Sequence, residues 1–499
     1  MLSNNLLSLA IWVPIVAGVL VLATGSDSRA ALARIVAFVG ALAGFLVTLP
    51  LFTGFDRLSG GYQFTEFHSW IPALNINYAL GVDGISVLFV ILNSFITLMV
   101  VLAGWQVIQK RTAQYMAAFL IMSGLINGAF AAQDAILFYV FFEGMLIPLY
   151  LIIGMWGGPR RVYASVKLFL YTLLGSLLML VAMVYLSYQA GGSFSIVDFQ
   201  NLKQIPLGVQ QLLFIAFFLS FAVKVPMWPV HTWLPDAHVE APTGGSMVLA
   251  AITLKVGAYG FLRFILPILP DASRYFAPVI IVLSLIAVIY IGMVALVQTD
   301  MKKLVAYSSI SHMGFVTLGL FLFSGGYLND WALKGAIIQM ISHGFVSAAM
   351  FMCIGVMYDR LHTRNIADYG GVVNVMPKFA AFMMLFGMAN AGLPATSGFV
   401  GEFMVIMGAV EVNFWVGALA ALTLIYGASY TLWMYKRVIF GPITNPEVKE
   451  MKDINCREFA ILAILAIAVL GMGLYPQAFI EVVHQAANDL ITHVAQSKI

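Results

Sequence analysis

Apolar residues run along this chain in long blocks and do not alternate with polar ones. Blocks of about 20 residues recur from one end of the sequence to the other, and a helix of that length crosses about 30 Å of hydrocarbon. The strands of a membrane β-barrel would alternate polar and apolar positions. The pattern therefore predicts an all-α polytopic membrane protein with about fourteen spans, at 3–23, 31–53, 80–106, 112–131, 134–155, 164–187, 210–230, 244–267, 276–297, 304–324, 333–357, 377–408, 412–438 and 458–478.

Two of these spans carry signals for a broken helix. Pro226 and Pro229 follow Lys224 in the seventh span, and Pro394 lies among glycines in the middle of the twelfth. Glu402 follows Lys224 by 178 residues, and His312 follows Glu143 by 169. These offsets predict two five-helix repeats, spans 4–8 and 9–13. Because five is odd, the repeats would be inverted, and the discontinuous spans 7 and 12 would mark the ion site. The implied divisions are 1–111, 112–268, 275–440 and 441–499.

Composition excludes a soluble globular protein, because 62% of the 499 residues are hydrophobic and 9% are charged, against about 25% charged in soluble domains. The sequence has no phosphate-binding loop and no dinucleotide fingerprint. Its two cysteines, Cys353 and Cys456, are too few for an iron–sulfur cluster. A net charge of +3 gives no reason to expect a nucleic-acid partner. Energy for transport must come from a partner protein or an ion gradient.

Basic residues concentrate in one set of loops. No Lys or Arg precedes Arg29, so the first span lacks the basic region of a signal peptide and is expected to remain as a helix. The positive-inside rule places the loops after odd-numbered spans in the cytoplasm and both termini in the periplasm. Those loops hold Arg29, Arg34, Lys110, Arg111, Arg160, Arg161, Lys302, Lys303, Arg360, Arg364, Lys378, Lys436, Arg437, Lys449, Lys452 and Arg457, whereas the opposite side holds Arg57, Lys203, Arg274, Lys334 and Lys498.

Ionisable residues inside the spans are the candidate functional residues. Each charge at this depth costs about 2.5–3.5 kcal/mol on insertion scales, so it implies a partner, water or a task. We expect a proton relay in which a Glu–Lys pair acts as a switch on a central lysine, histidines carry the proton onward, and a second Glu accepts it. In chain order these residues are Glu143, Lys224, Lys255, His312, His343 and Glu402.

Each assignment has a structural alternative. The Glu–Lys pair could simply hold two helices together, and either histidine could be a core residue bonded to a hydroxyl. Asp134, near the start of a span, is more typical of a helix N-cap. The loop segment with His231, Asp236, His238 and Glu240 could suggest a metal site, but its prolines and its spacing favour a structural loop or gate.

The motifs also carry a family resemblance. The segments FAVKVPMWPVHTWLPDAHVEAPTGGSMVLAAITLKVGAYGFLR, QTDMKKLVAYSSISHMGF, GLPATSGFVGEF and FFEGMLIPLYLIIGMWGG resemble the antiporter-like membrane subunits of respiratory complex I and of Mrp-type cation/proton antiporters. The resemblance covers essentially the whole chain. It implies one proton-translocating unit built from the six residues above, with Glu402 standing where other members carry a lysine.

The resemblance further implies partners and location. We expect a bacterial inner-membrane subunit beside the neighbouring antiporter-like chains L and N, in contact with the lipid bilayer. This chain would hold no cofactor, and FMN, iron–sulfur clusters and quinone would lie in partner subunits. The expected function is proton translocation within an NADH:quinone oxidoreductase. The alternatives are a subunit of an Mrp-type Na⁺/H⁺ antiporter and a structural spacer whose buried charges only fix helix register.

Overall fold

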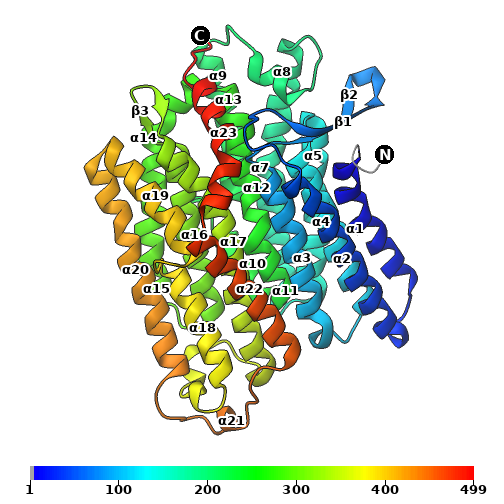
Figure 1. The fold of residues 1–499 in the computed structure, drawn as a ribbon, viewed down its shortest axis with the longest axis vertical. Helices are drawn as coiled ribbons and strands as arrows, with labels where there is room; N and C mark the ends of the chain where they lie inside the picture. Colours follow the sequence, from blue (N-terminus) through cyan, green and yellow to red (C-terminus); the bar gives the residue numbers. More distant parts are fainter. Residues whose placement is uncertain (1–4) are drawn as a thin grey trace.

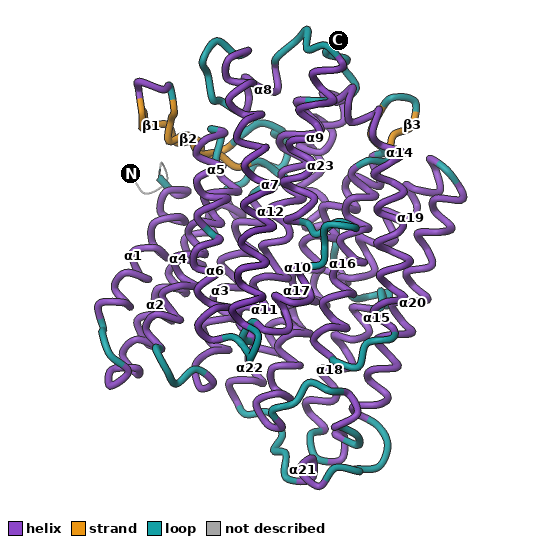
Figure 2. Tube along the Cα trace, turned by 180° about the vertical axis from the view of Figure 1, so that it is seen from behind, coloured by secondary structure: helices purple, strands orange, loops and turns teal. Residues whose placement is uncertain are grey.

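The computed structural model describes residues 5–499 as one bundle of helices (Figure 1). Within these residues, the strands form two hairpins, and loops lie mainly at the two ends of the bundle (Figure 2). Within the described residues, twelve helical segments are long and apolar enough to cross a membrane: Leu6–Ala23, Asp27–Thr53, Val87–Val107, Thr112–Ala131, Ala135–Trp156, Arg161–Gln189, Leu207–Lys224, Thr243–Ile268, Pro270–Leu296, Asp330–Leu361, Phe414–Ile439 and Cys456–Leu474. The prediction of an all-α polytopic membrane protein is confirmed.

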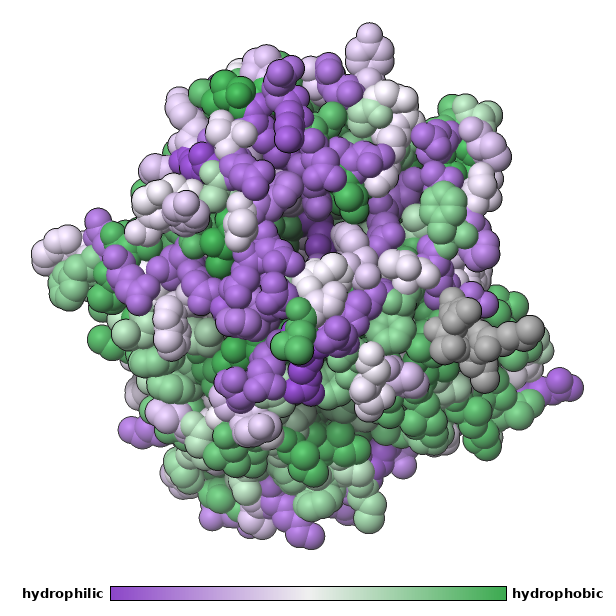
Figure 3. Space-filling model, turned by 45° about the horizontal axis from the view of Figure 1, so that its top comes forward, coloured by the Kyte–Doolittle hydropathy of each residue, from purple (hydrophilic) through white to green (hydrophobic). Residues whose placement is uncertain are grey.

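The outer helices are apolar on both sides. Leu174 and Val181 of α7 (Arg161–Gln189) are 73% and 67% exposed, and Ile467 of α22 (Cys456–Leu474) is 71% exposed. In water such residues would be an aggregation hazard, whereas in a bilayer they contact hydrocarbon. Hydrophilic side chains gather over one end of the bundle (Figure 3).

The N-terminal third contains one difference from the sequence prediction. Residues 54–79 were expected to be a loop and 80 to begin a span, but β1 and β2 form an antiparallel hairpin there. The third helix starts later because the Asp83 carboxylate accepts the N–H groups of Ile85 and Ser86, both at 3.0 Å, and so turns the chain from strand to helix. The elements are α1 (Leu6–Ala23), α2 (Ala30–Thr53), β1 (Gln63–Ile71), β2 (Ile76–Val82), α3 (Val87–Val107), α4 (Thr112–Ala131), α5 (Ala135–Gly144) and α6 (Leu146–Trp156).

The seventh span is interrupted where its prolines fall. Its helix ends at Lys224, and a turn leads into α10. The Trp233 indole donates to the Val223 carbonyl at 2.9 Å, satisfying a group that the break leaves without a helical partner. Around the break lie α8 (Ile196–Asn201), α9 (Leu207–Lys224), α10 (Trp233–Glu240), α11 (Thr243–Val248), α12 (Leu254–Gly260) and α13 (Leu266–Ile268), with π-helical turns at Leu249–Thr253 and Phe261–Ile265.

The twelfth span is interrupted between Asn390 and Ser397. Asn390 lies 166 residues after Lys224, so the two helix breaks match the 169-residue offset of Glu143 and His312 better than the 178-residue offset of Lys224 and Glu402. The elements are α14 (Pro270–Ile286), a π-helical turn (Ala287–Ile291), α15 (Gly292–Leu296), α16 (Met301–Leu320), β3 (Phe323–Ser324), β4 (Tyr327–Leu328), α17 (Asp330–Leu361), α18 (Pro377–Asn390), α19 (Ser397–Val412) and α20 (Phe414–Ile439).

The C-terminal segment is more ordered than the tail expected after the last span. After α21 (Pro446–Lys449) and α22, α23 (Gln477–Val494) packs one apolar side onto the bundle and leaves the other polar. Ile205 donates its N–H to the Lys498 carbonyl at 2.8 Å, and Arg274 donates to the Val494 carbonyl at 2.6 Å. The end of the chain therefore ties together the loop before α9 and the start of α14.

The loops separate into two ends, which we name by what they carry. The basic end holds the loops near 108–112, 157–160, 298–302, 362–376 and 440–455, tied by contacts such as the Trp156 indole to the Lys110 carbonyl at 2.9 Å. The terminal end holds the β1–β2 hairpin, α8 and the C-terminus (Figure 1). Most basic residues of the predicted cytoplasmic set thus lie on one side of the bundle.

Candidate ion path

Lys255 lies at the centre of the bundle and is fully buried. A π-helical turn precedes it on the same continuous helix, a feature that often marks functional sites. Its ammonium donates to the Ala250 carbonyl and lies 2.6 Å from Nδ1 of His343 on α17. No carboxylate forms an ion pair with it among residues 5–499. A buried amine with an imidazole for its partner can pass a proton directly.

The line continues from His343 to α16 and α19. The imidazoles of His343 and His312 have ring centroids 5.6 Å apart, and Nδ1 of His312 lies 2.7 Å from Oε1 of Glu402. A cavity of about 10 Å³ lies between these side chains and is also lined by Asn390, which is close to the space that one water needs. Lys255, His343, His312 and Glu402 therefore form one line across four helices.

Glycines at the second break let Glu402 approach its neighbours. Gly392 adopts φ +80°, and an added Cβ there would lie 2.8 Å from Oε2 of Glu402. An added Cβ at Gly401 would lie 2.6 Å from the backbone of Gln339, whose amide donates to Oε1 of Glu402 at 3.2 Å. The break in the twelfth span thus brings a carboxylate into the bundle at the level of the histidines.

Lys224 and Glu143 do not form the ion pair expected from the sequence. The Lys224 ammonium lies 4.2 Å from the centre of the Phe142 ring and 3.5 Å from the Phe142 carbonyl. Glu143 lies in the last turn of α5 and is half-buried, and its buried Oε1 has no hydrogen-bond partner among the described residues. Lys224 nevertheless packs against the helix that carries Lys255. An added Cβ at Gly257 of that helix would lie 2.8 Å from the Cβ of Lys224.

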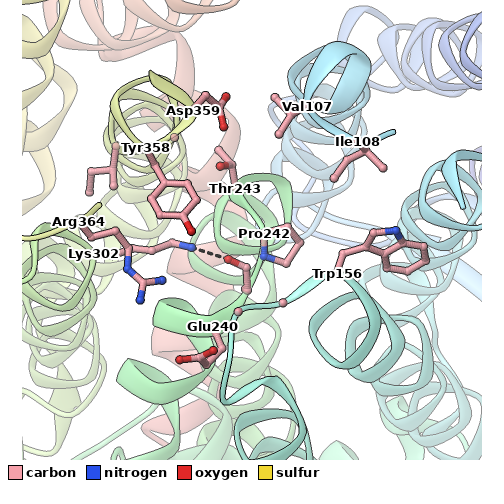
Figure 4. A pocket seen from close by; sticks show the side chains of 15 residues that line it. Val107, Ile108, Trp156, Glu240, Pro242, Thr243, Lys302, Tyr358, Asp359 and Arg364 are labelled. Carbon is pink, nitrogen blue, oxygen red and sulfur yellow. Dashed lines mark hydrogen bonds between the residues drawn. The ribbon is translucent and has the colours of Figure 1, made fainter. Parts of the chain in front are cut away.

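A polar cavity at the basic end was not predicted from the sequence. Figure 4 shows its lining, which encloses about 250 Å³ and brings together Glu240, Lys302, Asp359 and Arg364. Lys302 donates to the Ala241 carbonyl (Figure 4). From the sequence, Lys302 and Arg364 contributed only to the predicted orientation of the spans in the membrane. Their place in the cavity lining has no local sequence signal, because it depends on the loop after α10 folding against α16.

His238 lies within electrostatic reach of both Lys302, which lines that cavity, and Lys255. It is fully buried, and its ring stacks on Phe351 with centroids 4.5 Å apart. Neither ring nitrogen has a hydrogen-bond partner within residues 5–499. Phe351 is eight residues beyond His343 on α17, which corresponds to about 12 Å along a helix. A buried imidazole with both nitrogens free can accept or donate a proton once water reaches it.

The other candidates of this region have separate structural partners. Asp236 pairs with Lys167 at 2.7 Å, and the Glu240 carboxylate accepts the N–H of Arg160 at 2.9 Å. Within the described residues, no cluster of three or more His, Cys, Asp or Glu side chains could hold a metal ion. The carboxylate of Asp134 accepts the N–H groups of Ile136 at 2.9 Å and Leu137 at 3.1 Å, so its expected role as a helix N-cap is confirmed.

Comparison with known proteins identifies the family. The model described as "NADH:quinone oxidoreductase/Mrp antiporter, TM" matches residues 132–426, and the model described as "NADH-ubiquinone oxidoreductase chain 4, amino terminus" matches residues 61–130. NADH-quinone oxidoreductase subunit M of Rhodobacter capsulatus is 48% identical over 98% of this chain and 96% of its own length. The chain belongs to the subunit M, or chain 4, family of NADH-quinone oxidoreductase.

Solved structures agree with this family. A chain of "Respiratory complex I from Thermus thermophilus with bound NADH" superposes with a TM-score of 0.89 at 30% identity, covering 99% of this chain and all of that one. A chain of the Mrp complex from Dietzia shares the fold, with a TM-score of 0.83 over 97% of this chain, but is 22% identical and is matched over 52% of its own length. The Mrp interpretation is therefore the weaker one, and membership of the complex I family is confirmed.

Proposed function

We propose that this chain translocates protons as a membrane subunit of an NADH:quinone oxidoreductase complex. The observation that carries the proposal is the buried line Lys255–His343–His312–Glu402, in which the first and last contacts are 2.6 Å and 2.7 Å. The contact between Lys255 and His343 is a hydrogen bond short enough for proton transfer. His312 and Glu402 are equally close but are not aligned as a hydrogen bond, so the His312 ring must turn before it delivers a proton. Family membership supplies the second support, since relatives over the full length are named as subunits of that enzyme.

Proton entry in this proposal starts at the basic end. The cavity lined by Glu240 and Lys302 admits water, and His238 carries a proton from it toward Lys255. Lys255 is fully buried, so a proton must be carried to it through the packed side chains around it. In this proposal, waters complete the connection from the cavity to His238 and from His238 to Lys255.

Transfer along the line follows from which atoms face each other. Protonated Lys255 donates to Nδ1 of His343, whose Nε2 has no other partner within the described chain. A water in the cavity of about 10 Å³ connects His343 to His312, and Nδ1 of His312 delivers the proton to Glu402. The carboxylate at the end of the line then releases the proton.

Lys224 and Glu143 control the line in this proposal. When Lys224 lies over Phe142, its charge stays close to the helix of Lys255 and opposes protonation there. Movement of the Lys224 ammonium toward Glu143 would draw positive charge away and favour a proton on Lys255. The unpartnered Oε1 of Glu143 is available for that ion pair.

The proposal also covers the number of spans, their orientation in the membrane and the neighbouring subunits. We count α16 and the interrupted pair α18/α19 with the twelve segments above, which gives fourteen spans in two inverted repeats. The basic end faces the cytoplasm of a bacterial inner membrane, and both termini face the periplasm. Antiporter-like chains L and N are the neighbours, and partner subunits hold FMN, iron–sulfur clusters and quinone.

The test uses the assembled complex in proteoliposomes. His343→Gln removes the imidazole that receives from Lys255, so NADH-driven quinone reduction and proton pumping are expected to fall together. His362→Gln is the matched control, because His362 is exposed just beyond the same helix. Normal pumping by an assembled His343→Gln complex would refute the proposed line, and co-purification with flavin and iron–sulfur chains separates this function from that of an Mrp antiporter.

A further inference from the structure

Arg263 and Asp83 form a buried ion pair outside the proposed line. Their side chains are 8% and 6% exposed. Arg263 follows Lys255 by eight residues on the same helix, with Tyr259 midway between them. Nε of Arg263 donates to the Tyr259 hydroxyl at 2.9 Å, and that hydroxyl donates to the Phe130 carbonyl at 3.1 Å. Polar groups thus continue from the central lysine toward the terminal end.

Aromatic rings enclose the guanidinium. The ring centres of Tyr62 and Tyr259 lie 5.1 Å and 5.2 Å from Cζ of Arg263. The Tyr259 ring packs edge-on against Phe130 at 5.3 Å, and Phe130 stacks on Phe89 at 5.1 Å. The Tyr62 hydroxyl is buried and has no hydrogen-bond partner within residues 5–499. Dense packing of this kind excludes a continuous file of water.

The rest of the chain fixes the pair from outside. Gln200 of α8 donates to the Arg263 carbonyl at 3.0 Å. An added Cβ at Gly84, next to Asp83, would lie 2.0 Å from the carbonyl oxygen of Val482 in α23. Both α8 and the C-terminal helix therefore cover this site, so the pair has little freedom to move.

A guanidinium in this position opposes proton passage. Arginine is not deprotonated in proteins, so it cannot hand a proton onward, and a fixed positive charge in a narrow pore acts as an electrostatic barrier to cations. At the basic end, by contrast, a cavity of about 250 Å³ lies at the start of the helical segment Thr243–Ile268, which carries both Lys255 and Arg263. The two sides of Lys255 thus differ in access: the basic side has a polar cavity, and the terminal side has a packed charge.

We propose that the Arg263–Asp83 pair, flanked by Tyr62 and Tyr259, closes the terminal end of the compartment around Lys255. A proton that reaches Lys255 from the basic end must then continue through His343. The inference rests on the proposed function, because it gives that proton route its direction. The alternative is a purely structural pair that joins the start of α3 to the helix of Lys255.

The decisive variant is the double substitution Asp83→Asn with Arg263→Gln in the assembled complex. It removes both charges and keeps polar groups that can bond to each other. Passive proton leak is measured in proteoliposomes under an imposed pH gradient without NADH. We expect the leak to rise at least about tenfold, since charged clefts change local ion concentrations by about 10- to 1000-fold. Quinone reduction should persist, with fewer protons pumped per quinone.

The matched control is Arg57→Gln with Glu481→Gln, an ion pair at the same end whose side chains are 40% and 43% exposed. That control should leave the membrane tight. Adding Lys255→Met to the Asp83/Arg263 variant should lower the leak again, because the leak is expected to run through the Lys255 compartment. The leak is measured without NADH and does not depend on pumping. A membrane that stays tight would therefore overturn this inference without overturning the proposed function.

Three results would overturn the inference. A tight membrane with normal pumping would make the pair structural. A tight membrane with pumping lost would place the pair on an exit route. A leak that also passes potassium would indicate a damaged bundle. If the double variant fails to assemble, Tyr62→Ala keeps the ion pair but opens one side of the guanidinium, and it must also raise the proton leak.

Discussion

Glu402→Gln tests the end of the proposed line with little change of shape. The substitution replaces one oxygen by an NH₂ group in a side chain that is 2% exposed and lies 2.7 Å from Nδ1 of His312. A hydrogen bond to a charged group contributes about 1.5–3 kcal/mol and a neutral one about 0.5–1.5 kcal/mol. The expected loss of stability is therefore about 1–1.5 kcal/mol, too little to prevent assembly.

The effect on transport should be far larger. Gln cannot accept the proton from His312, and a positioned acid or base contributes about 10²- to 10⁴-fold to a proton-transfer step. NADH-driven pumping by proteoliposomes should fall by at least about 100-fold. Glu402→Asp withdraws the carboxylate by one methylene and should give an intermediate rate.

Glu411→Gln is the control for this experiment. Glu411 is exposed on the same helix and accepts from the Asn329 amide at 2.9 Å, so the same chemical change is made outside the line. Normal pumping is expected for that variant. The reasoning is refuted if Glu402→Gln assembles and pumps at the wild-type rate, or if the two substitutions reduce pumping equally.

Three further predictions concern packing and docking. Gly257→Val should destabilise the detergent-solubilised complex by about 1–3 kcal/mol, because even an added Cβ would lie 2.8 Å from the Cβ of Lys224. The measurement is a thermal melt, and an unchanged Tm would contradict this prediction. Trp233→Phe leaves the Val223 carbonyl unpaired and should cost about 1–3 kcal/mol, measured by the same melt. Burial, followed by the charge of Lys498, lowers the pKa of His493 below 6.5. The end of α23 therefore binds more protons when it is released from the bundle than when it is docked. Docking of α23 should weaken as the pH falls below 6.5. Hydrogen exchange of α23 should then rise on acidification, and His493→Gln should remove that change.

Hydrophobic pattern was sufficient for the class of fold, and the prolines and glycines within the apolar blocks were sufficient for the positions of the helix breaks. Long apolar blocks have few alternatives to membrane helices, and Pro226 and Pro229 cannot continue a helix without losing backbone hydrogen bonds. The β1–β2 hairpin was missed because Gln63–Ile71 mixes polar and apolar residues between long apolar blocks, so the segment resembled a loop. The amphipathic helix α23 was missed because it is too polar to resemble a span.

The candidate site was predictable only in its residues. Lys255, His343, His312 and Glu402 stand out as charges in apolar sequence, but their contacts depend on how four helices pack. For the same reason the Glu143–Lys224 ion pair was expected and is not formed: Phe142, one residue before Glu143, offers the ammonium an aromatic face and a carbonyl. The spacing of Lys255, Tyr259 and Arg263 on one helical face was a signal that could have led to the Arg263–Asp83 pair.

Passage of the pumped proton through Lys255 is tested by Lys255→Met, with NADH-driven quinone reduction and proton pumping measured on the same proteoliposomes after assembly is verified. Methionine fills a similar volume without a proton to carry. Lys334→Met is the control, because Lys334 is also buried, in α17, but pairs with Asp330 at 2.5 Å, outside the line. We expect Lys255→Met to abolish both activities and the control to retain them. Persistence of both activities in an assembled Lys255→Met complex would contradict this expectation.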